Sequence, residues 1–383
     1  MNFIYLSPSF PPNFQDFTRR LHELGANVLG IGDTPYEELS PELKASMSEY
    51  YKVDDLHDYD QLLRACGFLT HKHGRIDRLD SLQEYWLEVE ARLRTDFNIA
   101  GIKTDTINVV KSKSRMKERY REFGVPVARG RICYNEQEAL ELAAEVGYPL
   151  VAKPDVGVGA AATYRLENQE SIAKFFREKP AIDYLLEEYI KGTLVSFDGL
   201  TDRDGHAVFT ASHVFGRGIM ETVNEQDHLF YYSERVIPDD LEALGLTVVR
   251  AFDVRERFFH FEFFRTDRGL VALEVNLRPP GGLTANMFCY AVDMDIFREW
   301  ASIVMHNRME SPWSRKYHVG YVSRKDHKQY AHSHDEVVAH CGPLLVHHEP
   351  IQSVFRGAIG DYGYILRAGE LDPVLEATRF IQE

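Results

Sequence analysis

The sequence contains 383 residues, of which 44% are hydrophobic and 27% are charged, and its formal net charge is −15. A chain of this length is expected to form about two to three domains with buried cores. The negative net charge argues against a general binder of nucleic acid or of membrane surfaces. An anionic ligand such as a nucleotide would therefore need a local cluster of Lys, Arg and backbone NH groups.

The cysteines and the N-terminal residues indicate the compartment. Cys66, Cys133, Cys289 and Cys341 show no CxxC spacing, which favours a reducing environment and argues against a thiolate metal site. The N-terminus has no basic region and too short an apolar run for a secretion signal, and no stretch is long enough to span a bilayer. We therefore expect a cytoplasmic protein that binds neither nucleic acid nor membranes.

Short apolar strands alternate with amphipathic helices over residues 1–105, which is typical of a Rossmann-like α/β domain. The expected strands cover residues 2–6, 27–31, 50–53 and 67–70, and the expected helices cover residues 14–24 (capped by Asn13), 59–66 and 81–93. No GxGxxG motif follows the first strand, so a dinucleotide-binding role has little support.

From about Lys111 the chain changes character. A basic helix that ends at Gly124 is followed by a strand, a helix capped by Asn135, and a second strand that ends at Lys153. A further helix and strand complete this pattern, which predicts a small α+β unit over residues 106–191.

A larger unit is expected over residues 192–310. It should contain two strands around Asp204 and Gly205, a long loop over residues 213–234, a helix and a β-hairpin. We expect the remaining segment, residues 311–383, to pack on this unit. Whether it forms a lid, a dimer surface or part of the sheet is left open by the sequence.

The expected hairpin runs from Phe258 to Gly282. Because side chains alternate between faces, one face of the first strand carries His260, Glu262 and Phe264, and one face of the second carries Glu274, Asn276 and Arg278. Two carboxylates and an amide suit Mg²⁺, which completes its octahedron with water and phosphate oxygens. Arg278 adds a planar cation for phosphate or carboxylate oxygens. A solvated amphipathic hairpin is the alternative for this stretch taken alone.

Two lysines are candidate phosphate ligands. Lys113 lies at the start of the basic helix, and Lys153 ends an apolar strand, where a bare ammonium is costly without an anionic partner. Gly157 and Gly159 follow in a loop thin enough for backbone NH groups to approach an anion, although an ordinary tight turn has the same composition. The strand at Glu187 could pair with a purine edge, or it could be an edge strand with exposed acids.

In this order, these pieces resemble the ATP-grasp superfamily of ATP-dependent carboxylate–amine ligases over residues 111–306. The specific combination is a Lys eleven residues before Gly-Val-Pro, a strand-end Lys before a Gly-rich loop, Glu-Glu-Tyr-Ile shortly before Gly, and two Glu twelve residues apart with Glu-x-Asn-x-Arg. The resemblance implies an α/β and α+β fold, in which a Rossmann-like N-terminal domain precedes a two-lobed ATP-grasp fold. Residues 106–191 would be the nucleotide-binding small lobe and residues 192–310 the metal-binding large lobe.

The resemblance also implies roles for single residues. Those expected to bind ATP are Lys113, Lys153, Gly157 and Gly159 at the phosphates, and Glu187, Glu188 and Ile190 around the adenine. Those expected to hold Mg²⁺, as two ions with Mn²⁺ as the alternative, are Glu262, Glu274 and Asn276, and Arg278 would stabilise the acyl-phosphate oxygens as the catalytic residue. Leu194 departs from the family, because many members have a ribose-binding Glu there. Ser196 or Asp198 is the candidate replacement.

The activity implied by the resemblance is the ATP-dependent joining of a small carboxylate, such as an amino acid, to an amine. A homodimer is the assembly that the resemblance suggests. Two alternatives stay open: carboxyphosphate formation from bicarbonate, as in carbamoyl-phosphate synthetase or biotin carboxylase, and nucleotide binding without catalysis. Arg217, Glu221 and His228, together with the turn after Arg278, are expected to face the substrate.

Overall fold

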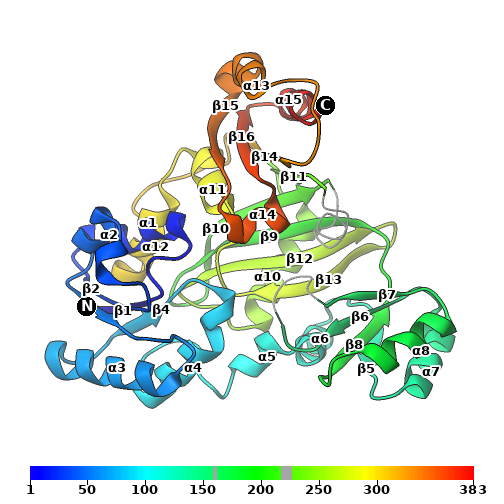
Figure 1. Cartoon of the computed structure of the whole chain (residues 1–383), viewed down its shortest axis with the longest axis horizontal. Helices are drawn as coiled ribbons and strands as arrows, with labels where there is room; N and C mark the ends of the chain where they lie inside the picture. Colours follow the sequence, from blue (N-terminus) through cyan, green and yellow to red (C-terminus); the bar gives the residue numbers. More distant parts are fainter. Residues whose placement is uncertain (158–161, 217–226) are drawn as a thin grey trace.

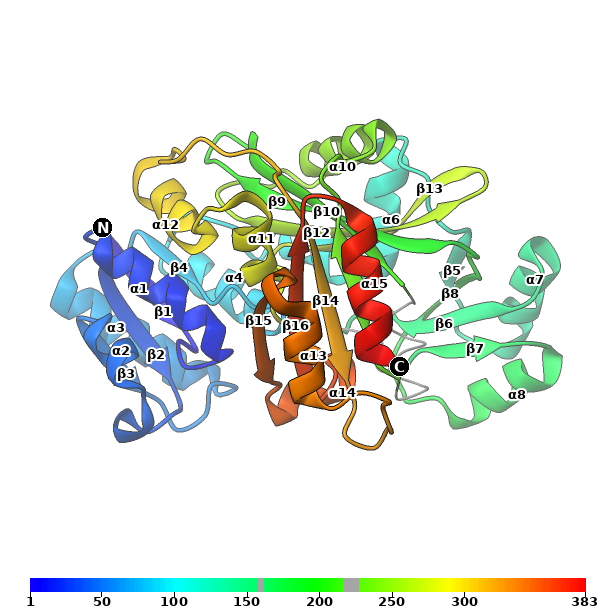
Figure 2. The ribbon, with the colours of Figure 1, turned by 90° about the horizontal axis from the view of Figure 1, so that it is seen from above.

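The computed structural model describes residues 1–157, 162–216 and 227–383. The strands in these ranges form three sheets: a four-stranded N-terminal sheet, an eight-stranded sheet, and a second four-stranded sheet, which we call the smaller sheet. The eight-stranded sheet lies between the other two (Figure 1). Figure 2 shows the same order from above, with the N-terminal and the smaller sheets at opposite ends of the molecule. Among the helices in the described ranges, none has both the length and the apolar character that crossing a bilayer requires.

The N-terminal sheet confirms the predicted α/β layer. Its four parallel strands, in the order β3-β2-β1-β4, are β1 (Asn2–Leu6), β2 (Asn27–Gly32), β3 (Glu49–Lys52) and β4 (Arg78–Asp80). The accompanying helices are α1 (Gln15–Glu23), α2 (Pro41–Ala45), α3 (Tyr59–His73) and α4 (Leu87–Asp96).

Three details of this layer differ from the prediction. The helix expected over residues 81–93 begins later, because α4 covers Leu87–Asp96. The strand expected over residues 67–70 is wrong, because α3 continues to His73 and β4 is the fourth strand. Leu62, Cys66 and Leu69 are all buried, and their spacing places them on one helical face. Asn13 does not cap α1, because Phe14 occupies the N-cap position and no side chain caps this helix. The Asn13 Nδ2 instead donates to the Gly282 carbonyl oxygen at 3.0 Å.

The smaller sheet is antiparallel, with the order β5-β8-β6-β7. Its strands are β5 (Gly130–Ile132), β6 (Leu150–Pro154), β7 (Tyr164–Leu166) and β8 (Tyr184–Glu188). Helices α7 (Glu136–Val146) and α8 (Gln169–Glu178) accompany it, and α5 (Ile107–Lys111) and α6 (Lys113–Glu122) precede it. The predicted cap is confirmed, because the Asn135 side chain accepts from the Glu138 backbone N at 3.0 Å.

The eight-stranded sheet is antiparallel throughout, with the order β13-β12-β9-β10-β11-β14-β16-β15. The strands contributed by the predicted larger unit are β9 (Thr193–Thr201), β10 (Ala207–Phe215), β11 (Phe230–Ser233), β12 (Phe258–Thr266) and β13 (Gly269–Asn276). The helices of this part are α10 (Asp239–Ala251), α11 (Thr284–Val292) and α12 (Ile296–His306). The predicted hairpin is confirmed as β12 and β13.

The long loop expected over residues 213–234 is wrong at both ends, because β10 extends to Phe215 and β11 begins at Phe230. Arg217 and Glu221 lie outside the described residues. His228 is described, and its Nδ1 lies 3.7 Å from Asp227 Oδ1.

The C-terminal segment extends the same sheet. Its elements are β14 (His318–Arg324), α13 (His334–Cys341), β15 (Leu345–Pro350), α14 (Ser353–Ile359), β16 (Tyr362–Ala368) and α15 (Leu371–Gln382). The sequence left open whether this segment forms a lid, a dimer surface or part of the sheet. The structure shows that it forms part of the sheet, because β14 pairs with β11 and β16 lies between β14 and β15. The domain boundaries stay a prediction.

An aromatic cluster joins the N-terminal layer to the eight-stranded sheet. Phe17 on α1 is fully buried, and its ring lies 4.7 Å from Phe297, 5.1 Å from Trp300 and 5.7 Å from Phe258 on β12. Aromatic side chains bury large apolar areas, and such ring pairs add to that stabilisation. Phe17 therefore couples the two sheets energetically.

We predict that Phe17→Ala lowers the free energy of unfolding by about 3–5 kcal/mol, the usual cost of truncating a buried aromatic side chain. Urea denaturation followed by circular dichroism measures this change. Phe123→Ala is the matched control, because Phe123 is 41% exposed and its truncation should cost about 1 kcal/mol or less. Equal losses in both variants would contradict a coupling role for Phe17.

Candidate active site

A cavity of about 530 Å³ is lined by residues of both the eight-stranded sheet and the smaller sheet. Its volume falls in the range usual for small-molecule sites. The predicted site residues that line it are Lys113, Lys153, Gly157, Glu187, Glu188, Ile190, Glu262, Glu274, Asn276 and Arg278. Gly159 lies outside the described residues.

The hairpin brings the predicted metal ligands face to face. Glu262 lies opposite Glu274, and His260 lies opposite Asn276, in the register of β12 and β13. Gly269, with a φ of 108°, closes the hairpin in a conformation that side chains rarely adopt. The Asn276 Nδ2 donates to the His260 carbonyl oxygen at 3.4 Å, which leaves the amide oxygen for a ligand.

Lys113 is placed by the start of α6. The Asp155 carboxylate accepts from the Ser112 hydroxyl and from the Ser114 backbone N, both at 2.7 Å, which ties the helix start to the end of β6. A carboxylate at a helix N-terminus is favourable. The Lys113 Nζ then lies 3.1 Å from Glu274 Oε1 and donates to the Gly157 carbonyl oxygen at 3.2 Å.

Lys153 and Lys117 share the carboxylate of Glu187. The Lys153 Nζ lies 2.5 Å from Glu187 Oε1, and the Lys117 Nζ lies 2.6 Å from Oε2 in an ion pair without hydrogen-bond geometry. Burial acts to raise the pKa of Glu187, but Lys153 and Lys117 outweigh it and the pKa is lowered. Burial lowers the pKa of Lys117 in spite of the attraction of Glu187.

Glu188 lines the cavity, but its carboxylate is already bound. Arg129 donates to Glu188 Oε2 from Nε at 2.9 Å and from Nη2 at 2.6 Å, and the Arg129 backbone N donates to Oε1 at 2.8 Å. Burial acts to raise the pKa of Glu188, but the bonds from Arg129 lower it. Glu188 thus fixes the end of β8, next to Ile190.

A buried polar network lies beneath the hairpin. The Asp198 carboxylate on β9 accepts from His260 Nδ1 at 2.5 Å, from His213 Nδ1 at 2.8 Å and from the Ser196 hydroxyl at 2.6 Å. Burial opposes the charge on His260, but Asp198 and Glu262 raise its pKa to about 9. The His260 Nε2 lies 3.3 Å from Glu262 Oε1, so the network also orients Glu262.

This network removes both candidate replacements for the ribose-binding Glu. Ser196 and Asp198 are fully buried and bonded to each other, and neither lines the cavity. Leu194 does line it. The polar groups expected at the ribose position are therefore not available from these residues.

Arg278 follows β13 at the edge of the cavity. Its Nη1 donates to the Pro279 carbonyl oxygen at 2.8 Å, and its Nε lies 3.9 Å from Glu84 Oε2 of the N-terminal layer. Glu84 is held at 2.8 Å by Lys111. The N-terminal layer therefore supports the predicted catalytic arginine.

Sequence reasoning missed three contributors to this site. Lys117 is four residues after Lys113 on the same helix, and this spacing could have identified it. Glu84 and the cavity-lining residues of α14 are brought in by tertiary packing, which leaves no local pattern.

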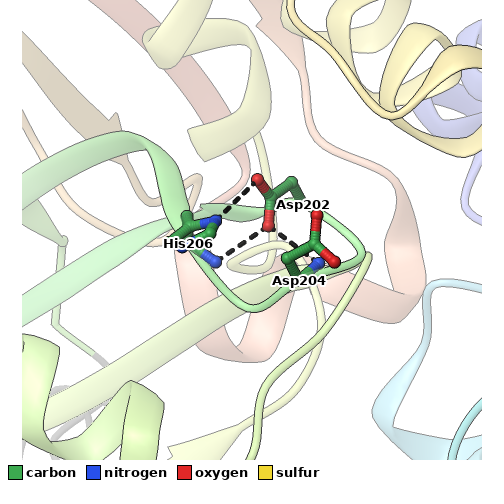
Figure 3. Close-up of side chains that lie close together, drawn as sticks. All are labelled: Asp202, Asp204 and His206. Atoms are coloured by element: carbon green, nitrogen blue, oxygen red, sulfur yellow. Dashed lines mark hydrogen bonds and ion pairs between the residues drawn. The ribbon is translucent and has the colours of Figure 1, made fainter.

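Asp202, Asp204 and His206 form a separate cluster of ligand-type side chains at the turn between β9 and β10 (Figure 3). Asp202 Oδ1 accepts from the backbone N of Asp204 at 3.0 Å and of His206 at 2.8 Å, and Oδ2 lies 3.1 Å from His206 Nδ1. Such bonds are those of a tight turn started by Asp. The cluster does not line the cavity, and we assign it no metal.

Comparison with known sequences identifies the central part of the chain. The family model of the ATP-grasp domain matches residues 146–287. The carbamoyl phosphate synthase large chain of Clostridium acetobutylicum is 23% identical over 193 residues, and the chloroplastic arginine-specific large chain of Oryza sativa is 26% identical over 218 residues. These matches cover 47% and 54% of this chain but 17% and 18% of the relatives, so the chain spans less than a fifth of their length.

Solved structures share the fold over nearly the whole chain. The L-amino acid ligase from Bacillus licheniformis has a TM-score of 0.74 at 12% identity and covers 99% of this chain and 96% of its own. The N5-carboxyaminoimidazole ribonucleotide synthetase from Thermus thermophilus has a TM-score of 0.72 at 16% identity and covers 100% and 97%. The predicted α/β and α+β fold is therefore confirmed. Residues 146–287 match the family model of the ATP-grasp domain, and nearly the whole chain shares the fold of these solved structures.

Proposed function

We propose that this protein is an ATP- and Mg²⁺-dependent ligase that activates a small carboxylate as an acyl phosphate and joins it to an amine. The observation that carries the proposal is the meeting of Lys113, Lys117 and Lys153 with two opposed glutamates and Arg278 in one cavity. The three lysines are 7%, 2% and 6% exposed, and buried ammonium groups need anionic partners. Lys117 and Lys153 share the single carboxylate of Glu187, which leaves cationic capacity for phosphate oxygens.

The hairpin oxygens fit Mg²⁺. Glu262 and Glu274 offer two carboxylates in register, and Asn276 offers an amide oxygen, which is a hard donor set that phosphate and water oxygens would complete. We propose that these residues hold two ions, with Mn²⁺ as the alternative. A bound ion would neutralise charge on the phosphate oxygens.

The chemistry follows from the weakness of a carboxylate as an electrophile. A carboxylate oxygen attacks the γ-phosphorus of ATP, the bond to the bridging oxygen breaks, and ADP leaves. The amine nitrogen then attacks the acyl carbon, phosphate departs, and the nitrogen loses a proton. In this proposal Lys113 and Lys153 position the phosphates, while Arg278 stabilises the oxygens that gain charge.

The nucleotide base is assigned to the end of β8. Because Glu188 is bound by Arg129 and Glu187 by two lysines, we propose that the backbone near Ile190, rather than either carboxylate, carries most of the adenine recognition. This proposal differs from the expectation that Glu187 and Glu188 bind the adenine together with Ile190.

Phosphate release from MgATP, with products identified by mass spectrometry, tests the proposed function. We expect turnover that requires an organic carboxylate and an amine, and a product mass equal to their sum less water. Turnover with bicarbonate alone would replace the proposal by carboxyphosphate chemistry. ATP binding without turnover on any of these compounds would replace it by a regulatory role.

We predict that Glu274→Gln lowers the rate of ATP turnover by at least about 100-fold, because the opposed pair loses one of its two carboxylates. The concentration of Mg²⁺ that gives half-maximal rate should rise as well. The measurement is a Mg²⁺ titration of phosphate release, with circular dichroism to verify the fold. Glu141→Gln, on the exposed side of α7, is the matched control. An unchanged Mg²⁺ dependence in Glu274→Gln would remove the hairpin from the mechanism.

We predict that Lys153→Ala weakens ATP binding by roughly 10-fold or more, the usual effect of losing a charge-assisted hydrogen bond. Glu187 retains Lys117, so the variant should fold. Calorimetric titration with a non-hydrolysable ATP analogue and Mg²⁺ gives the affinity. Lys174→Ala, at an exposed position of α8, should bind like the unmodified protein. The same affinity in both variants would argue against a phosphate role for Lys153.

A further inference from the structure

One end of the cavity is built from parts that the proposed ATP and metal residues do not use. We call the apolar end the set Phe215, Leu229, Tyr231, Phe355, Ala358 and Ile359, all of which line the cavity. Tyr231 lies on β11, three strands from β12 in the sheet order. At the usual spacing of strands this is about 14 Å from the metal-binding hairpin. The apolar end is therefore separate from the proposed phosphate site but continuous with it.

Half of the residues of the apolar end come from the C-terminal segment. Phe355, Ala358 and Ile359 have the spacing of one helical face, and all three are half-buried. Val354, on another face of α14, is 64% exposed. The helix thus turns a short apolar face toward the cavity.

The position of α14 is fixed by contacts on several sides. The Lys325 Nζ donates to the Arg356 carbonyl oxygen at 2.6 Å, and the Tyr321 hydroxyl donates to the Ile359 carbonyl oxygen at 2.8 Å. The Phe355 ring stacks on Phe10 of the N-terminal layer at 5.4 Å. These bonds hold the apolar face in place.

The turn after Arg278 connects the apolar end to the proposed reaction centre. A Cβ at Gly282 would lie 3.1 Å from Ile359 Cδ1, and Gly282 has a φ of 64°, so this glycine permits the close approach of α14. Pro280, Gly281 and Gly282 all line the cavity. The turn therefore runs along the cavity from Arg278 to Gly282, which lies against Ile359 of the apolar end.

The Tyr231 hydroxyl and the His213 Nδ1 near the apolar end are bonded within the protein, whereas the buried His213 Nε2 has no hydrogen-bond partner in the part of the chain that the structure describes. The Tyr231 hydroxyl lies 2.8 Å from Thr284 Oγ1, which donates to the Gly281 carbonyl oxygen at 2.9 Å. His213 Nδ1 is held by Asp198 at 2.8 Å. Among the described residues that line the cavity, the Lys and Arg side chains are Lys113, Lys117, Lys153 and Arg278, which lie on α6, on β6 and directly after β13. Among the described residues, the apolar end has no Lys or Arg side chain that could pair with an acidic or phosphorylated group.

We propose that the apolar end is the specificity pocket for the carboxylate substrate, and that this substrate carries an uncharged, apolar side chain. The inference rests on the proposed function and deepens it by naming the substrate class. Burying an unpaired charge in such a pocket is costly, whereas an aliphatic or aromatic side chain gains from the contact. Bicarbonate, which has no side chain, would leave this pocket unfilled.

Hydroxylamine trapping tests the substrate class without knowledge of the natural amine. An acyl phosphate reacts with hydroxylamine to give a hydroxamate and phosphate, so each carboxylate can be assayed with MgATP and one common nucleophile. We expect kcat/KM for leucine, methionine or phenylalanine to exceed that for aspartate, glutamate or lysine on the order of 100-fold. A preference for charged or phosphorylated carboxylates would overturn the proposal.

Variants of α14 show whether the apolar end determines which carboxylate substrate is preferred. Ile359→Arg should lower kcat/KM for leucine and raise that for aspartate, while the KM for ATP stays within about twofold. Val354→Arg adds the same charge to an exposed position of the same helix and should leave the leucine-to-aspartate ratio unchanged. If Ile359→Arg fails to fold, Ile359→Ala should shift the preference from leucine toward phenylalanine by roughly tenfold. An unchanged ratio in a folded Ile359 variant would overturn the assignment.

Calorimetry with leucine and a non-hydrolysable ATP analogue separates the two proposals. Leucine binding without any turnover would reject the ligase activity and retain the apolar pocket. Turnover with other carboxylates and no binding of apolar ones would reject the pocket and retain the ligase activity. Neither binding nor turnover would reject both.

Discussion

The opposition of Glu262 and Glu274 is the constraint on which the site depends. Like charges directly opposite on neighbouring strands destabilise a sheet, so each carboxylate needs a cation. Lys113 lies 3.1 Å from Glu274, and His260 lies 3.3 Å from Glu262. The pKa of His260, raised to about 9, keeps this histidine charged at neutral pH. The fold thus supplies one cation to each glutamate, and a divalent ion would supply more charge at the same place.

This charge balance ties together elements that are far apart in the sequence. Lys113 reaches the hairpin only because Asp155, at the end of β6, fixes the start of α6. His260 is charged because Asp198 on the neighbouring strand shares its carboxylate with it. Removing one partner of such a buried pair leaves an uncompensated charge, which costs more than the pair contributes. Charged interactions therefore couple the hairpin, α6 and the smaller sheet.

The hairpin could be read from the sequence because alternation in a strand is local. The pairing of Glu262 with Glu274 could not, because it depends on a register shift between Glu262 and Phe263 that the turn does not predict. The strand expected over residues 67–70 failed because a short apolar run fits a buried helix face equally well. The contributions of Glu84 and Ile359 depend on how distant layers pack, which single-sequence periodicity does not contain. The sequence could therefore predict the charged residues of the site but not the apolar end of the cavity.

The separation of the charged residues from the apolar end also explains how one fold can serve several substrates. The two solved structures described above share this fold at 12% and 16% identity, and they are an amino acid ligase and a ribonucleotide synthetase. A scaffold that only positions phosphates places few demands on the acceptor end, so specificity must come from residues added around it. In this chain those residues lie on α14, which follows a strand at the edge of the sheet. Because α14 contacts the cavity through three side chains on one face, small changes in that helix can alter the substrate without disturbing the opposed glutamates.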